Sequence, residues 1–212
     1  MEVEAKFSIP DLVTFDRLRQ LEEWVGYRLE SAGVKRVHDR YLDTDDRAIM
    51  RAGYACRVRL KGQDCIATLK GLGGVDAASG IHHRAEYEVS VDQDDPTAWP
   101  ESRARDLALQ LSGGRRLHEL FALNQERHLY LLYADGPQGP RRVAELSLDV
   151  VTPGQDRSQL YYELELELLD QGREADLQVL TSDLKEIWGF RPEPRSKFER
   201  GLDLVDAVQA GD

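Results

Sequence analysis

The sequence predicts an α+β fold that combines roughly eight strands with three amphipathic helices. The first observation behind this prediction is a two-residue alternation of charged and apolar side chains, which returns along most of the chain. The second is a helical spacing of apolar residues in three other segments. The third is size, because 212 residues, 41% of them hydrophobic, suffice for one domain with a substantial core.

The predicted strands share one pattern, in which one parity carries charge and the other is apolar. The clearest case is 161–168, where Glu163, Glu165 and Glu167 alternate with leucines. The alternation is weakest at 36–43 and 125–133. In chain order, the strands are expected at 1–9, 36–43, 55–61, 67–70, 84–91, 125–133, 143–151 and 161–168.

Three helices are expected between these strands. The first covers 11–25 and follows Pro10; the second covers 101–111 and ends at Gly113-Gly114. The third covers 174–188 and ends at Gly189. All three are amphipathic, so each is expected to cover the apolar face of a sheet.

Charge and composition exclude several classes of protein. The chain has 28 Lys and Arg against 39 Asp and Glu, a net charge of −11 that disfavours nucleic-acid binding. No apolar run has the length of a membrane span, and Glu2 and Glu4 stand where a secretory signal carries basic residues. We therefore expect a cytoplasmic protein that binds neither membrane nor nucleic acid. Cys56 and Cys65 lack the spacing of a zinc site.

The glutamates that share one face of a predicted strand suggest a cation site. Neighbouring glutamates on one face of 161–168 lie about 7 Å apart, and Glu2 and Glu4 repeat this arrangement near the N-terminus. A divalent cation would turn their repulsion into a ligand set, and carboxylates alone favour Mg²⁺ or Mn²⁺ over zinc. The alternative is that the charged parity is the solvated face of an open antiparallel sheet.

Basic residues also share parities. Arg57 and Arg59 lie on one strand, Lys70 on the next and Arg84 beyond it, while Lys6 follows Glu2 and Glu4. If the strands close into a barrel, its interior is a channel lined by both signs. A linear polyphosphate suits such a channel, because basic side chains hold its length and a metal bridges oxygens at the reacting end.

An ordered series of motifs resembles the CYTH superfamily, the triphosphate tunnel metalloenzymes. It begins with the ExExK motif of Glu2, Glu4 and Lys6 and covers essentially the whole chain. The closest resemblance is to CYTH domains that precede a CHAD domain, a helical polyphosphate-associated module. The motifs that follow are Tyr41–Thr44, Arg57-Val-Arg59, Thr68–Gly71, Arg84–Glu88, Arg127, Ala144–Asp149, Glu163–Glu167 and Ser196–Gly201.

This resemblance implies a closed antiparallel β-barrel, a tunnel, that hydrolyses or cyclises triphosphate compounds with Mg²⁺ or Mn²⁺. It assigns the metal to Glu2, Glu4, Asp149, Glu163 and Glu165. Which of Glu163, Glu165 and Glu167 are direct ligands stays open. It assigns the phosphates to Lys6, Arg57, Arg59, Lys70, Arg84, Arg127 and Lys197, of which Lys6, Arg57, Arg59, Lys70 and Lys197 are expected to be catalytic.

The domain is expected to cover 1–203, with 204–212 a tail that begins a linker or a further domain, for which the resemblance implies the CHAD type. The leading hypothesis is a metal-dependent triphosphatase in which water attacks the terminal phosphorus of inorganic triphosphate or a short polyphosphate. The side chains predicted to face the interior are all charged, and no aromatic site for thiamine or adenine is evident among them. This disfavours the alternatives of thiamine triphosphatase and adenylate cyclase. A sensor that binds polyphosphate or nucleotide without catalysis is the other alternative.

Three further residues receive structural roles. His82 and His83 are adjacent, so they point to opposite faces and cannot form one ligand pair; loop or surface positions are expected. Arg40 could reach phosphate, but a structural role is at least as well supported.

Overall fold

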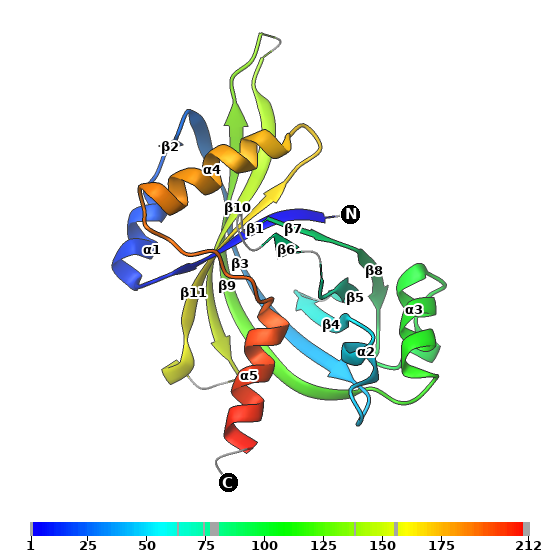
Figure 1. The fold of residues 1–212 in the computed structure, drawn as a ribbon. Helices are drawn as coiled ribbons and strands as arrows, with labels where there is room; N and C mark the ends of the chain where they lie inside the picture. The colour runs from blue at the N-terminus through cyan, green and yellow to red at the C-terminus, as the bar shows by residue number, and fades with distance from the viewer. Residues whose placement is uncertain are drawn as a thin grey trace.

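The computed structural model describes residues 2–62, 64–73, 75–76, 81–137, 139–154 and 157–209, and these form one large antiparallel sheet with helices around it (Figure 1). The strands are β1 (Glu2–Ile9), β2 (Glu23–Trp24), β3 (Tyr27–Asp43), β4 (Tyr54–Lys61), β5 (Asp64–Gly71), β6 (Val75–Asp76), β7 (Ile81–Arg84), β8 (Glu86–Val91), β9 (His118–Ala134), β10 (Arg141–Pro153) and β11 (Tyr161–Leu168). The helices are α1 (Leu12–Arg19), α2 (Ala48–Arg51), α3 (Arg103–Ser112), α4 (Glu174–Glu186) and α5 (Lys197–Gln209), with short 3₁₀ turns at Pro96–Ala98 and Arg157–Gln159. The predicted α+β class is confirmed.

In the part of the chain that the structure describes, the sheet is not closed by hydrogen bonds, so the expected closed barrel is wrong in that respect. Its strand order is β6-β7-β1-β11-β10-β9-β3-β4-β5-β8, with β2 paired to β3. The single strand expected at 84–91 changes partner at Ala85, because β7 pairs with β1 whereas β8 pairs with β5. The covalent chain at Ala85, rather than a strand ladder, therefore connects the two sides of the sheet.

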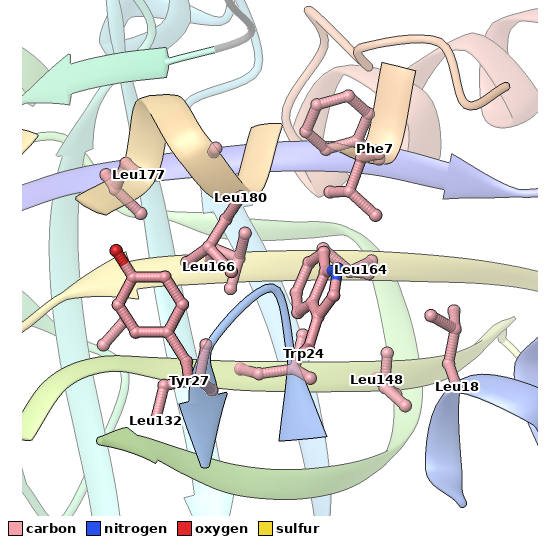
Figure 2. Close-up of a cluster of buried hydrophobic side chains, with 14 of the residues drawn as sticks. Phe7, Leu18, Trp24, Tyr27, Leu132, Leu148, Leu164, Leu166, Leu177 and Leu180 are labelled. Carbon is pink, nitrogen blue, oxygen red and sulfur yellow. The ribbon is translucent and has the colours of Figure 1, made fainter. Parts of the chain in front are cut away.

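The two faces of the curved sheet are sharply different. The apolar parity of β1, β10 and β11 points outward and packs against α1, β2 and α4 (Figure 2). Five side chains of this cluster have no exposed surface: Phe7, Leu146, Leu148, Leu164 and Leu166. A second cluster lies between β4, β5, β8 and the helices α2 and α3. The charged parity must therefore point inward, away from both cores.

The predicted first helix is too long. α1 ends at Arg19, and the chain then forms the β2–β3 hairpin with Trp24 paired to Tyr27. The two residues between them, Val25 and Gly26, both have positive φ, as a tight two-residue hairpin turn requires. The apolar residues Leu21 and Trp24 continue the helical spacing by coincidence, which explains the error. The second and third predicted helices correspond to α3 and α4 within a few residues.

The strands β3 and β9 are much longer than expected. Both have 17 residues, and their far ends pair from Tyr27–Ala134 to Lys35–Arg127. Residues 30–36 of β3 are all exposed, so neither face carries an apolar parity that sequence analysis can detect.

Helix α5 was not expected. Ser196 caps it, since the Ser196 hydroxyl accepts a hydrogen bond from Glu199 N and the Glu199 carboxylate accepts one from Ser196 N. Gly201 faces the ring of Phe121, where an added Cβ would lie only 2.2 Å from Cε2. The predicted tail 204–212 continues this helix to Gln209, and 210–212 lie outside the described residues. None of the helices in the described ranges is both long and apolar enough to cross a membrane.

Candidate functional site

Three rows of inward side chains cross β1, β11 and β10. Strand register places Glu4, Glu167 and Glu145 in the first row and Lys6, Glu165 and Ser147 in the second. Ser8, Glu163 and Asp149 form the third row. Side chains paired directly across an antiparallel ladder have Cβ atoms about 5 Å apart, so the alternating sequence motifs become a two-dimensional array of charge.

This array forms one wall of an internal cavity of about 620 Å³. The opposite wall comes from β3, β4, β5 and β8. Ten of the twelve predicted site residues line the cavity: Glu2, Glu4, Lys6, Arg57, Arg59, Lys70, Arg84, Arg127, Glu165 and Lys197. The other two, Asp149 and Glu163, are fully buried in the wall and contact Lys197. The structure thus brings all twelve together, and the solvated-face alternative does not hold.

The third row and Glu165 form an acidic cluster. One carboxylate oxygen from each of Asp149, Glu163 and Glu165 lies within 4.8 Å of the others. The ammonium group of Lys197 lies among them, with Nζ 2.9 Å from Asp149 Oδ2, 2.6 Å from Glu163 Oε1 and 2.7 Å from Glu165 Oε1. Arg127 and Lys6 also contact this acidic cluster through Glu165.

These contacts set the protonation states of the cluster. Burial acts to raise the pKa of Glu165, but Lys197, Lys6 and Arg127 outweigh it and hold that pKa well below its usual range. The pKa of Asp149 is lowered in the same way, against burial, by Arg127 and Lys197. The pKa of Glu163 is instead raised by burial. For Lys197, burial is outweighed by the three carboxylates, which raise its pKa.

A second acidic group lies at the start of β1. Lys70 Nζ is 2.5 Å from Glu2 Oε2 and 3.3 Å from Glu4 Oε1, and Lys6 is 3.1 Å from the same Glu4 oxygen. Although burial opposes it, the ammonium groups of Lys6 and Lys70 lower the pKa of Glu4 to about 2. Burial and the neighbouring Glu4 raise the pKa of Glu2 to about 7.

The shift of Glu2 predicts a pH dependence of stability in the metal-free protein. Its folded-state pKa of about 7 exceeds the ordinary 4.5, so its contribution to stability is complete below pH 4.5 and is lost as the pH rises to 7. The loss is on the order of 3 kcal/mol, or about 6 to 12 °C in melting temperature. In EDTA, Glu2→Gln should therefore melt at a higher temperature than wild type at pH 8, and the difference should vanish at pH 4.5. Glu23→Gln, an exposed substitution on β2, is the control. Equal melting temperatures of wild type and Glu2→Gln across this range would contradict the prediction.

Two further carboxylates belong to the first row of the array. Among the described residues, Glu145 and Glu167 form no ion pair, although both line the cavity beside Glu4. Glu86 and Glu88, which share their inward parity with Arg84, line the cavity as well.

The basic residues differ in how fully their donors are used. Arg59 donates two hydrogen bonds to Asp39, at 2.6 and 2.8 Å, and Arg127 donates to Asp149 and Glu165. By contrast, Nε of Arg57 and both Nε and Nη1 of Arg84 are buried without a hydrogen-bond partner in the described chain. Both residues line the cavity, and Arg84 Nη1 lies 3.6 Å from Glu4 Oε1 without a hydrogen bond to it. Buried donors without an acceptor are costly to the fold.

Asp39 is a further residue of the site, and no sequence motif indicates it. Its side chain has no exposed surface and accepts hydrogen bonds from Arg59 and Gln125. Although burial acts against it, the guanidinium groups of Arg57 and Arg59 lower the pKa of Asp39 to about 2. The parity of Val37, Asp39 and Tyr41 points inward, a signal present in the sequence but weak, since it mixes one apolar, one acidic and one aromatic residue.

The cavity is not lined by charge alone, contrary to the sequence prediction. Tyr41, Ala55, Leu72 and Phe198 form an apolar patch on its wall and belong to one packed cluster. The Tyr41 and Phe198 ring centroids are 5.5 Å apart.

The expectation for His82 needs correction, whereas the structural role expected for Arg40 is confirmed. His82 is not in a loop or on the surface: it lies on β7 without exposed surface, and its Nδ1 contacts the Arg84 guanidinium. Burial, together with Arg84 and Lys6, lowers the pKa of His82 to about 4, so it is neutral. Arg40 does not line the cavity and instead donates two hydrogen bonds to Asp94.

The donor set fits a hard divalent cation. The acidic cluster offers oxygen atoms only, three of them within 4.8 Å of one another. The first-row carboxylates Glu145 and Glu167 lie one row from Glu165 and two rows from Asp149 and Glu163. Carboxylates without imidazole or thiolate are typical ligands of Mg²⁺ and Mn²⁺.

Several solved structures have a fold similar to that of this chain. Of solved structures, HpAC1 from Hippeastrum, an adenylyl cyclase candidate described as having a dominant triphosphatase activity, superposes with a TM-score of 0.69 at 18% identity, covering 94% of each chain. A candidate adenylate cyclase from Bacillus halodurans gives a TM-score of 0.64 at 21% identity, covering 94% of this chain and 96% of the other. PH1819 from Pyrococcus horikoshii gives 0.57 at 19% identity, covering 96% and 99%. At these identities the likeness shows a common fold.

No curated protein matches the sequence. The model of the CYTH domain matches residues 1–202, nearly the whole chain. The ordered motifs, the inward array of charge and this match agree, and the chain belongs to the CYTH domain family.

Proposed function

We propose that this CYTH domain is a triphosphatase that hydrolyses inorganic triphosphate or a short polyphosphate with Mg²⁺ or Mn²⁺. The observation that carries the proposal is the pairing, in one cavity, of buried guanidinium donors without acceptors and an acidic cluster of oxygen ligands. A phosphate chain with a bound divalent cation would satisfy both features, because its oxygens would accept from the guanidinium groups and its cation would bind the acidic cluster. The triphosphatase activity described for the Hippeastrum protein, which shares the fold, supports this proposal.

The phosphate chain is held by the basic side chains. Arg57 and Arg84 supply the unused donors, and charge-assisted hydrogen bonds of guanidinium groups to phosphate are among the strongest in proteins. Lys70 and Arg127 line the same cavity and add two further cations to it. As the phosphoryl group transfers, these fixed charges stabilise its equatorial oxygens without reorganisation, which is the main contribution a protein makes to this reaction.

The cation is assigned to carboxylates of β1, β10 and β11: Glu2, Glu4, Asp149, Glu163 and Glu165. When bound, Mg²⁺ or Mn²⁺ supplies Lewis-acid polarisation of the phosphoryl oxygens. Water attacks the terminal phosphorus, the bond from that phosphorus to its bridging oxygen breaks, and diphosphate leaves. Glu145 and Glu167, which have no ion pair in the described chain, are the carboxylates available to accept the proton that water loses.

The apolar patch favours a second candidate. Tyr41, Ala55, Leu72 and Phe198 offer contact area for an organic group attached to a triphosphate, as in thiamine triphosphate or ATP. Inorganic triphosphate remains our first choice because Tyr41 and Phe198 are only 5% and 2% exposed, so little of either ring is free to stack. A CHAD-type neighbour in a longer protein and a cytoplasmic location stay proposals from the sequence.

The function is tested by phosphate release. The metal-free protein should be assayed with triphosphate, thiamine triphosphate and ATP, each with Mg²⁺, Mn²⁺ or EDTA. We expect release from triphosphate at a kcat/KM at least tenfold above the other two, and none in EDTA. Preference for an organic triphosphate would favour the second candidate, and binding without turnover of any substrate would favour the non-catalytic sensor.

A further inference from the structure

The ammonium group of Lys197 occupies the acidic cluster to which the divalent cation is assigned. Its Nζ contacts an oxygen of each of the three carboxylates at 2.6 to 2.9 Å, and the same three carboxylates each offer an oxygen within 4.8 Å of the others. An ammonium ion and a divalent ion cannot share this position, because the cation would lie within contact distance of a like charge.

The cluster remains partly neutralised without Lys197. Asp149 still contacts Arg127 at 3.0 Å, Glu163 contacts Arg200 at 2.9 Å, and Glu165 contacts both Arg127 and Lys6. Removal of the lysine ammonium therefore leaves no carboxylate without a cation. A divalent ion that replaces one ammonium group raises the total positive charge around the acidic cluster by one.

The backbone of Lys197 is fixed while its side chain is long. Lys197 is the first residue of α5, whose start is capped by Ser196 and Glu199. The next residue, Phe198, packs against Tyr41 and Phe121, and Arg47 pairs with Asp206 further along the helix. Rotation of the four side-chain torsions can thus carry the ammonium into the cavity, which Lys197 already lines, without movement of the helix.

We propose that Lys197 is an internal counter-ion that the divalent cation displaces from Asp149, Glu163 and Glu165, and that the released ammonium then binds the substrate phosphates. This inference rests on the proposed function. One residue then neutralises the acidic cluster before the cation binds and contacts the substrate afterwards, so that cation entry completes the phosphate site.

The first test is Mn²⁺ binding to the EDTA-washed protein without substrate, measured by the EPR signal of free Mn²⁺. Lys197→Gln removes the competing charge and should bind Mn²⁺ at least tenfold more tightly than wild type, whereas Lys197→Arg should not. Arg200→Gln is the matched control, because it removes an equal charge from the same helix and the same Glu163, but from the other carboxylate oxygen. Its Mn²⁺ affinity should stay within threefold of wild type.

The second test uses the wild-type protein and needs no variant to fold. Reductive methylation of Lys197, followed by mass spectrometry, should be at least fivefold faster with Mn²⁺ than with EDTA, while exposed Lys35 should react at an unchanged rate. The inference is overturned if Lys197→Gln binds Mn²⁺ no more tightly than wild type, if Arg200→Gln matches it, or if Mn²⁺ leaves the methylation of Lys197 unaccelerated. Each of these outcomes is compatible with normal hydrolysis of triphosphate, whereas absent hydrolysis with Mn²⁺-induced release of Lys197 would reject the proposed function alone.

Discussion

Glu165→Gln is expected to lower kcat/KM for triphosphate at least 1000-fold, equivalent to about 4 kcal/mol of transition-state stabilisation. Glu165 is the only described carboxylate that contacts Lys6, Arg127 and Lys197 together, and it belongs to the acidic cluster as well. Its amide replacement keeps the shape but removes the charge that aligns three cations and contributes to the cation site. Steady-state phosphate release at saturating Mg²⁺ measures the effect.

The same variant should also melt at a lower temperature than wild type in EDTA. Loss of one partner from a buried ion pair costs roughly 3 to 5 kcal/mol when the remaining charge stays buried. Glu167→Gln is the matched control, because it lies two residues away on the same strand and has no ion pair in the described chain. It should not lower the melting temperature. A Glu165→Gln variant with kcat/KM within tenfold of wild type would show that Glu165 is outside the reacting centre.

Asp39→Ala is expected to lower the free energy of unfolding by roughly 3 to 5 kcal/mol. The substitution leaves the Arg59 guanidinium partly buried without the carboxylate that accepts its two hydrogen bonds, and it removes the acceptor of the Gln125 amide. Urea unfolding measures the loss. The double variant with Arg59→Met should regain part of this stability, because no unpaired charge remains in the wall.

Asp39→Ala should also weaken triphosphate binding, since Arg59 loses the contact that fixes its orientation toward the cavity. Exposed Asp64, at the edge of β5, provides a control in Asp64→Ala. A free energy of unfolding within 1 kcal/mol of wild type for Asp39→Ala would mean that the Asp39–Arg59 pair adds nothing to the fold.

The sequence predicts the inner site well because alternation fixes which side chains share a face. On β1 and β11, the parities of Glu4, Lys6, Glu163 and Glu165 lead directly to the observed array. Strand register, which sequence does not supply, decides the contacts. The carboxylates that seem to repel one another in the sequence are interleaved with cations from β9 and α5, so Glu165 is stabilised rather than crowded.

The remaining differences have local causes. Tyr41 and Phe198 come from segments 157 positions apart, so their contact in the cavity wall cannot be read from either segment. The exposed stretch of β3 has no alternation to detect. The change of partner at Ala85 depends on two different neighbours, β1 and β5, and no signal within 81–91 announces it.

The central claim is that one ligand contacts both walls of the cavity at once. Hydrogen exchange of the wild-type protein with Mg²⁺ and diimidotriphosphate, in which both bridging oxygens are NH groups, tests it most directly. Bound ligand should slow exchange together in β1, which carries Lys6, in β4, which carries Arg57, and at the start of α5, which carries Lys197. Mg²⁺ alone should leave β4 unchanged, because Arg57 contributes no candidate metal ligand. Protection confined to one of these three segments, or absent from all of them, would contradict the account.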